Sequence, residues 1–170
     1  MPTLHACPLS RLSETLAATG ARHLVTFASP GMPVDRPKGI DPHHHLVIGV
    51  SDIVAARDGH VLADAAHVAR FLEFIRDWPR EAPLLIHCYA GISRSTAAIY
   101  AAACALAPGR DEAALARALR RAAPSATPNR RIVALADTLL ERGGRMEAGV
   151  AAVGRGAEAF EGTPFRLDPT

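Results

Sequence analysis

The hydrophobic pattern in the first half of the chain predicts strands separated by helices and long loops. Apolar runs with the length of a strand occur at residues 4–9, 23–27, 46–50 and 83–87. The last run lies between prolines and a turn, which is typical of a buried strand. Residues 29–42, which include four prolines, and residues 51–63 predict long loops.

Helical periodicity accounts for most of the remaining chain. Apolar residues one turn apart predict helices at residues 10–19, 64–78, 94–107, 111–121 and 127–144. Thr127 followed by Pro128 matches a helix cap and the first helical residue. The helix at 94–107 is apolar on every face, so we expect it in the middle of the protein. These elements predict one α/β domain with a central sheet flanked by helices, at residues 1–144. A short helix and an extended tail follow at residues 145–170.

Composition and charge narrow the class of protein. A net charge of +2 over 170 residues argues against nucleic-acid binding, which usually needs a basic patch. Three cysteines, Cys7, Cys88 and Cys104, do not make a disulfide framework and fit a reducing cytosol. The longest apolar stretch, residues 97–107, is too short to span a bilayer, and the first 18 residues lack a signal-peptide pattern. We therefore expect a cytoplasmic protein that binds neither nucleic acid nor membrane. The sequence leaves its oligomeric state open.

One short loop, between the strand that ends at His87 and the helix that begins at Arg94, carries candidate chemistry. Because a helix N-terminus presents unpaired N–H groups and a curled loop adds more, an anion binds readily there. Gly91 supplies the backbone freedom that such a curl needs, and Arg94 offers a two-pronged donor to phosphate. The same positive field stabilises a thiolate at Cys88. One loop thus binds a phosphate and supplies a nucleophile.

The spacing Cys-x5-Arg occurs twice, and its context separates the two cases. Cys104 and Arg110 match it, but Cys104 lies inside an apolar helical run that stops at Pro108-Gly109. We therefore assign Cys104 to core packing. Cys88 instead follows a strand and precedes a glycine-containing loop and a helix.

The segment from His87 to Ser95 resembles the signature of the protein tyrosine phosphatase superfamily, and is most similar to the compact dual-specificity phosphatases and their bacterial relatives. The resemblance extends over about residues 46–140. It implies a mostly parallel sheet of four to five strands with helices on both sides, no metal and no cofactor. It also implies hydrolysis of a phosphomonoester through a phosphocysteine intermediate. The residues expected to form the phosphate-binding loop are Tyr89, Ala90, Gly91, Ile92, Ser93 and Arg94.

The same resemblance implies a general acid on the loop after the preceding strand. Asp52 matches this position best, and Asp58, on the same loop, matches the usual spacing to the cysteine. Asp64 is better explained as a helix cap. The Trp-Pro-Asp triplet of the larger tyrosine phosphatases is missing, so the acid remains open between Asp52 and Asp58, with Asp52 preferred.

Supporting roles are also implied by the resemblance. Ser95 would donate a hydrogen bond to the thiolate, and His87 would orient the loop rather than transfer protons. Asn129 would either brace the phosphate-binding loop or simply begin a helix. A disulfide between Cys7 and Cys88 is conceivable, but a buried strand thiol is favoured. The run His43-His44-His45 cannot face one metal ion from a strand because neighbours alternate sides, so we expect a solvated loop end.

These observations favour a protein tyrosine or dual-specificity phosphatase that acts on a phosphorylated protein or a small phosphomonoester. An inositol-phosphate or phosphoinositide phosphatase is the main alternative, because Arg36 and Lys38 of the proline-rich loop could meet additional phosphates. A non-catalytic phosphoprotein-binding module would normally lack one of the catalytic groups. A rhodanese-type sulfurtransferase is disfavoured by the Arg-Ser pair that begins the helix.

Overall fold

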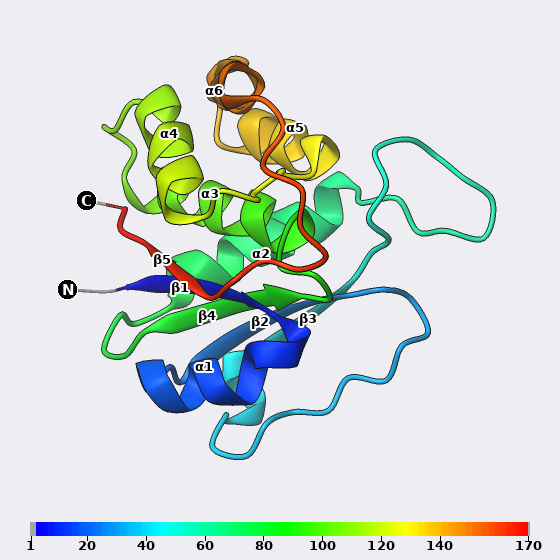
Figure 1. Ribbon diagram of the computed structural model, residues 1–170, viewed down its shortest axis with the longest axis vertical. Coiled ribbons are helices and arrows are strands. Elements are labelled where there is room, and N and C mark those ends of the chain that lie inside the picture. The colour runs from blue at the N-terminus through cyan, green and yellow to red at the C-terminus, as the bar shows by residue number, and fades with distance from the viewer. Residues whose placement is uncertain (1–2, 170) are drawn as a thin grey trace.

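The computed structural model describes residues 3–169 and has a five-stranded sheet at its centre (Figure 1). The strands are β1 (Leu4–Pro8), β2 (His23–Ala28), β3 (His45–Gly49), β4 (Leu84–Cys88) and β5 (Phe165–Leu167). Their order is β3-β2-β4-β1-β5, in which only β5 is antiparallel to its neighbour. The predicted α/β fold with a mostly parallel sheet is confirmed. Residues 1–2 and 170, at the ends of the predicted domain ranges, lie outside the described residues.

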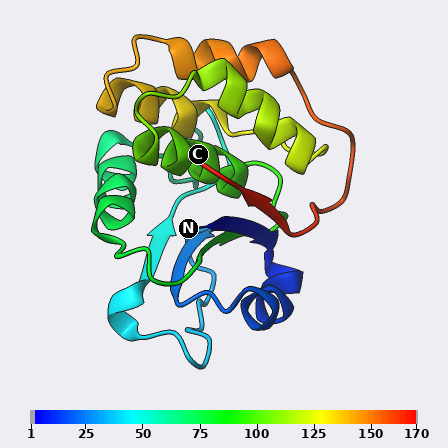
Figure 2. The same ribbon diagram turned by 90° about the vertical axis from the view of Figure 1, so that its left-hand side faces the viewer.

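Helices cover both faces of this sheet, as predicted (Figure 2). One face holds η1 (Leu9–Arg11) and α1 (Leu12–Thr19), and η2 (Pro42–His44) leads into β3. The other face holds α2 (Ala65–Asp77), α3 (Arg94–Leu106), α4 (Glu112–Ala122), α5 (Arg130–Leu139) and α6 (Arg145–Val153). Helix α3 packs against β1 and β4 beneath the other helices, which explains why it is apolar all round. No helix within residues 3–169 is long and apolar enough to cross a membrane.

The helix expected to start at Thr127 starts instead at Arg130. The N–H of Thr127 donates to the carbonyl of Ile92 (2.9 Å), so this residue is engaged by the loop after β4. Asn129 is the N-cap, and its Oδ1 accepts from the N–H of Ile132 (3.0 Å). Asparagine caps a helix at least as well as threonine, so capping preference alone does not choose between Thr127 and Asn129. The hydrogen bond of Thr127 to Ile92 leaves Asn129 as the cap.

The C-terminal segment after α6 is more ordered than an extended tail. Residues 154–164 run beside the loop that follows β4, and the chain then adds β5 to the edge of the sheet next to β1 (Figure 1). Phe165 and Leu167 are buried whereas Arg166 is exposed, as expected of an edge strand. Three residues are too few for periodicity to indicate a strand, so only pairing with β1 reveals it.

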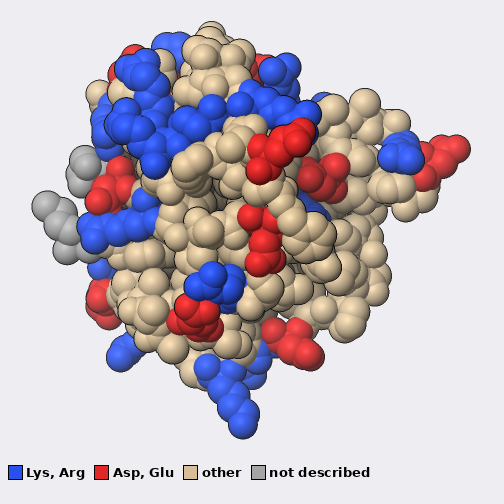
Figure 3. All heavy atoms as spheres, in the orientation of Figure 1, with Lys and Arg blue, Asp and Glu red and all other residues tan. Residues whose placement is uncertain are grey.

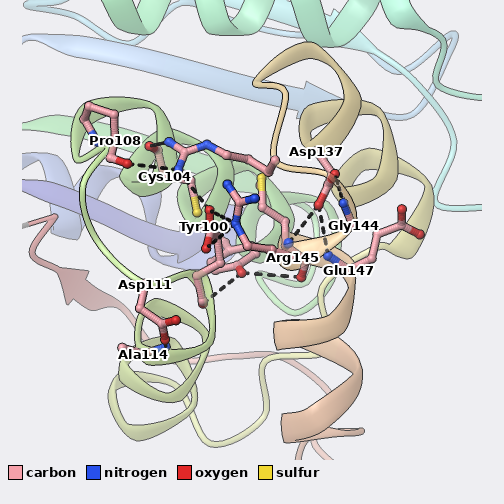
Figure 4. Close-up of polar contacts among 12 residues, drawn as sticks. Tyr100, Cys104, Pro108, Asp111, Ala114, Asp137, Gly144, Arg145 and Glu147 are labelled. Atoms are coloured by element: carbon pink, nitrogen blue, oxygen red, sulfur yellow. Dashed lines mark hydrogen bonds and ion pairs between the residues drawn. The ribbon is translucent and has the colours of Figure 1, made fainter.

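A buried polar cluster ties the helices together on the face away from α1 (Figure 4). Arg142 forms a 2.9 Å ion pair with Glu112, and Arg145 approaches the same carboxylate at 3.2 Å. Burial favours a higher pKa for Glu112, but its own backbone amide and the two guanidinium groups outweigh burial and hold that pKa below 4.5. Asp137 accepts hydrogen bonds from backbone N–H groups at the start of α6. These contacts fix α4, α5 and α6 relative to one another.

Candidate active site

The sulfur of Cys88 lies inside the loop between β4 and α3. The N–H of Gly91 points at Sγ from 3.3 Å, and Oγ of Ser95 lies 3.1 Å from it. Cys88 is only 3% exposed. Gly91 has φ = 68°, and a side chain there would come within 2.7 Å of the backbone nitrogen of Pro8. Glycine is therefore required both by backbone conformation and by space.

The loop carbonyls are held from outside by donors that come from distant parts of the chain. The carbonyl–donor pairs are Tyr89 with Leu9 (3.1 Å), Ala90 with Gly162 (2.8 Å), Ile92 with Thr127 (2.9 Å) and Ser93 with Asn129 (3.1 Å). The carbonyl and the N–H of one peptide unit point in opposite directions, so an outward carbonyl turns the next N–H inward. The Ala90–Gly91 peptide illustrates this, because its carbonyl meets Gly162 and its N–H meets Sγ. The loop thus has the inward-facing amides of an anion nest.

The guanidinium of Arg94 is buried at the start of α3, where it is 5% exposed. Its Nη1 donates to the carbonyl of Val50 (2.9 Å) and to Oγ of Ser29 (3.2 Å), which follow β3 and β2. Its Nε is buried and has no hydrogen-bond partner within residues 3–169. A buried charged donor without a protein acceptor is costly, and an anion oxygen would satisfy it.

Asp52 contacts the loop between β4 and α3, which is the predicted phosphate-binding loop. Its Oδ1 accepts from the hydroxyl of Ser93 (2.6 Å) and from Nδ2 of Asn129 (2.9 Å). The loop at 51–63 projects away from the sheet (Figure 1), and no described residue forms a hydrogen bond with the carboxylate of Asp58. Asn129 is the N-cap of α5, and it also donates hydrogen bonds to Asp52 and to the carbonyl of Ser93 in the loop after β4.

His87 lies behind the loop in a row of polar groups across the sheet. Its Nε2 is 2.7 Å from Oγ1 of Thr26, which in turn is 2.8 Å from Nε2 of His45. Burial lowers the pKa of His87 to about 4, so its imidazole is neutral near pH 7. A neutral, hydrogen-bonded imidazole suits a positioning role. The side chains of the run His43-His44-His45 do not converge on one point. His45 forms a hydrogen bond with Thr26, whereas His44 stacks on His23.

The other two cysteines lie apart from this site. Cys7 is paired in register with His87 in the parallel β1–β4 pair, so its side chain lies on the face opposite to that of Cys88. Burial raises the pKa of Cys7 to about 11 and that of Cys104 to about 12. All three cysteines are free thiols. Cys104 is part of the core beneath α4 and α5, as its apolar sequence context indicates.

A cavity of about 230 Å³ opens beside Cys88 between the phosphate-binding loop and the proline-rich loop. The proline-rich loop contributes Met32, Pro33, Val34 and Asp35 to its wall. Arg36 and Lys38 do not line it, and the guanidinium of Arg36 donates to the carbonyl of Ile40 instead. The cavity is therefore lined mainly by apolar side chains, with Thr26, Ser29 and His87 as neutral polar residues and Asp35 as an acidic one, which was not predicted from the sequence.

Comparison with known proteins agrees with this geometry. Residues 56–121 match the protein-tyrosine phosphatase family. The resemblance to the protein tyrosine phosphatase superfamily is confirmed. A search of curated proteins finds no significant match.

Solved structures share the fold of this chain at low sequence identity. DUSP15 aligns with a TM-score of 0.65 and 19% identity, over 94% of this chain and 96% of that one. A mouse putative dual specificity phosphatase complexed with zinc tungstate aligns at 0.61 and 21%, over 86% of each chain. Human DUSP28 aligns at 0.60 and 23%, over 84% of this chain and 94% of that one. The fold is that of a dual-specificity phosphatase.

Proposed function

We propose that this chain hydrolyses phosphorylated residues of proteins through a phosphocysteine intermediate on Cys88. The observation that supports the proposal is that the sulfur of Cys88 lies at the centre of the loop, where donors also suited to a phosphate converge. There the sulfur of Cys88 meets the N–H of Gly91 at 3.3 Å and Oγ of Ser95 at 3.1 Å, while four loop carbonyls are tied outward. A sulfur anion and a phosphate are stabilised by the same inward-facing donors.

In the first step, the Cys88 thiolate attacks phosphorus and the bond between phosphorus and the leaving oxygen breaks. The amides of the loop and the Nε of Arg94 stabilise the charge on the equatorial oxygens. Asp52 donates a proton to the leaving oxygen. Ser93 and Asn129 occupy its Oδ1, so Oδ2 is the oxygen available for this transfer.

In the second step, water attacks the phosphocysteine. Asp52, now a carboxylate, takes a proton from the water, and the sulfur–phosphorus bond breaks to release inorganic phosphate. The hydroxyl of Ser95, 3.1 Å from Sγ, donates to the departing thiolate. His87 acts as a positioning residue within β4, behind the loop.

The cavity beside Cys88 supports a phosphoprotein as substrate over an inositol polyphosphate. Additional phosphates would need cations near the reacting one, but the cavity presents Asp35 and no lysine or arginine. Arg36, which could have supplied such a cation, donates to the carbonyl of Ile40 instead. An aromatic or alkyl group beside the phosphate suits these apolar walls.

Hydrolysis of p-nitrophenyl phosphate by purified variants tests the mechanism. We expect Cys88→Ser and Arg94→Ala to abolish turnover, and acid quenching of the wild type during turnover to trap a phosphate on the peptide that contains Cys88. Cys104→Ala is the matched control, because Cys104 has the same spacing to an arginine and lies in the core. Cleavage of thiosulfate by the wild type, without phosphatase activity, would favour the sulfurtransferase instead.

We also propose that the protein is cytoplasmic and that its chain consists of a phosphatase domain and a C-terminal addition. Three free thiols and a net charge of +2 support a reducing cytoplasm and no nucleic-acid partner. We retain residues 1–144 as the phosphatase domain, with residues 145–170 as a C-terminal addition that packs on it.

A further inference from the structure

Exposed hydrophobic side chains gather around the phosphate-binding loop. Among the described residues seven large hydrophobic side chains are exposed, and five of them line the two cavities that flank this loop. We call these five the apolar rim: Leu9, Met32, Val34, Tyr89 and Phe160. Clustered exposed apolar groups mark interaction sites, whereas scattered ones need no explanation.

The two cavities are adjacent and share two lining residues. The first is the cavity beside Cys88, and the second, of about 260 Å³, lies on the other side of Tyr89 and is bordered by Phe160 and Glu161. Leu9 and Tyr89 line both of them. A chain that places one side chain over Cys88 therefore reaches the second cavity with a neighbouring side chain.

Phe160 is held beside the loop on a fixed backbone. It is 90% exposed, yet Glu161 accepts a hydrogen bond from the hydroxyl of Ser10 (2.7 Å) and the N–H of Gly162 donates to the carbonyl of Ala90 (2.8 Å). An exposed aromatic ring next to two anchored residues is preorganised for contact, which lowers the entropy cost of binding.

The charges around the rim restrict the kind of partner. His87 is neutral near pH 7, so among the described residues the charged side chains that line these two cavities are Asp35 in the first and Glu161 in the second, and both are acidic. Phe160 also borders a third cavity, which has one basic and one acidic side chain, Arg155 and Glu158. On the face in Figure 3, lysine and arginine side chains gather mainly over the helices at the top of the view. Acidic residues in a ligand would be repelled at the rim, and apolar residues would bury surface there.

We infer that the apolar rim docks an extended segment of the phosphoprotein substrate, with an apolar side chain next to the phosphorylated residue seated against Phe160. The shared wall with the cavity beside Cys88 selects this occupant, because one substrate chain can place its phosphorylated residue over Cys88 and the next side chain against Phe160. The inference rests on the proposed function and adds a sequence preference to it.

Phosphotyrosine peptides that differ only in the residues flanking phosphotyrosine test this inference. With leucine in those positions, the wild type should show about tenfold higher kcat/KM than with glutamate. Phe160→Ala should lower kcat/KM for the leucine peptide about tenfold, a loss of the size expected for one apolar contact. Hydrolysis of p-nitrophenyl phosphate by Phe160→Ala should stay unchanged, because Phe160 lines only the second cavity and this small substrate occupies the cavity beside Cys88. Val54→Ala, also exposed but lining neither cavity, is the matched control.

The possible outcomes distinguish failure of the docking inference from failure of the proposed phosphatase function. Equal kcat/KM for leucine and glutamate peptides, or equal effects of Phe160→Ala and Val54→Ala, would overturn the docking inference while the phosphatase activity stands. Self-association of the wild type in sedimentation experiments that Phe160→Ala abolishes would mean that a second copy covers the rim, and would also overturn it. If the wild type hydrolyses neither p-nitrophenyl phosphate nor any peptide, the proposed function fails. Peptide binding to Cys88→Ser would then still test the rim, with the same order of preference expected.

Discussion

A methyl group added at Gly162 would press directly on the phosphate-binding loop. The N–H of Gly162 donates to the carbonyl of Ala90, and an added Cβ would lie 2.6 Å from the carbonyl oxygen of Gly91 and 3.3 Å from its carbonyl carbon. Non-bonded carbon contacts are optimal at about 3.5–4.0 Å, so one of the two backbones must move by several tenths of an ångström. Gly162→Ala therefore perturbs the loop without touching a proposed catalytic side chain.

The size of the effect follows from how tightly Gly91 is confined. Gly91 also lies close to β1, because a Cβ atom built on Gly91 would be only 2.7 Å from the backbone nitrogen of Pro8. Movement of the loop away from Gly162 would rotate the N–H that meets Sγ at 3.3 Å. Overpacking of this kind costs about 1–3 kcal/mol. If the loop absorbs the displacement in the transition state, kcat falls roughly 5- to 150-fold.

The assay combines turnover with stability. Initial rates with p-nitrophenyl phosphate give kcat and KM, inhibition by inorganic phosphate reports the affinity of the loop for the anion, and thermal unfolding reports stability. We expect Gly162→Ala to lower kcat and to weaken phosphate inhibition. Its melting temperature should fall by roughly 3 °C per kcal/mol of destabilisation.

Gly149→Ala is the matched control for overpacking. Its methyl group would lie 3.0 Å from the hydroxyl of Tyr100 and 3.2 Å from backbone atoms of α4, none of which contacts the phosphate-binding loop. It should lower the melting temperature and leave kcat within about twofold. If Gly162→Ala is destabilised as Gly149→Ala is but keeps the kcat and phosphate affinity of the wild type, the C-terminal segment does not position the loop and the reasoning is wrong.

Three further outcomes are expected. Asp52→Asn should lower kcat for a phosphotyrosine peptide by roughly 10²-fold, as expected for loss of a general acid, whereas Asp58→Asn should stay near the wild type; a slower Asp58→Asn would move the acid to Asp58. Ser95→Ala should slow release of the thiolate, so that rapid-mixing experiments show a burst of p-nitrophenol followed by a slower steady state; loss of the burst would place its role before the intermediate. The ion pair of Glu112 should stabilise the fold fully above the ordinary carboxyl pKa near 4.5, and this contribution should disappear as the pH falls through the lowered folded-state pKa. Arg142→Met, which leaves the buried carboxylate poorly paired, should cost about 3–5 kcal/mol in urea unfolding at neutral pH and less at acidic pH; an equal loss at both would exclude the charge pairing.

The amino-acid sequence by itself determined the central part of the fold and the loop that carries the chemistry. The run before His87, the glycine at 91 and the all-apolar helix after Arg94 predict a buried strand, a tight loop and a central helix. Each of these features depends on neighbouring residues, because backbone preference and burial period are local properties. Local context also distinguishes Cys104, which lies within an apolar helical run, from Cys88, which ends a strand.

Contacts between distant residues were decided by tertiary structure alone. Thr127 and Asn129 are both good caps, and only the bond from Thr127 to Ile92 shows why α5 begins after Asn129. Asp52 and Asp58 share a loop, and only the packing of α5 against that loop brings the first of them to Ser93. The hydrogen bond from Gly162 to Ala90 joins residues 72 positions apart and has no sequence pattern. A local pattern encodes which groups can bond, but the partner is chosen only when packing brings separate segments within hydrogen-bond distance.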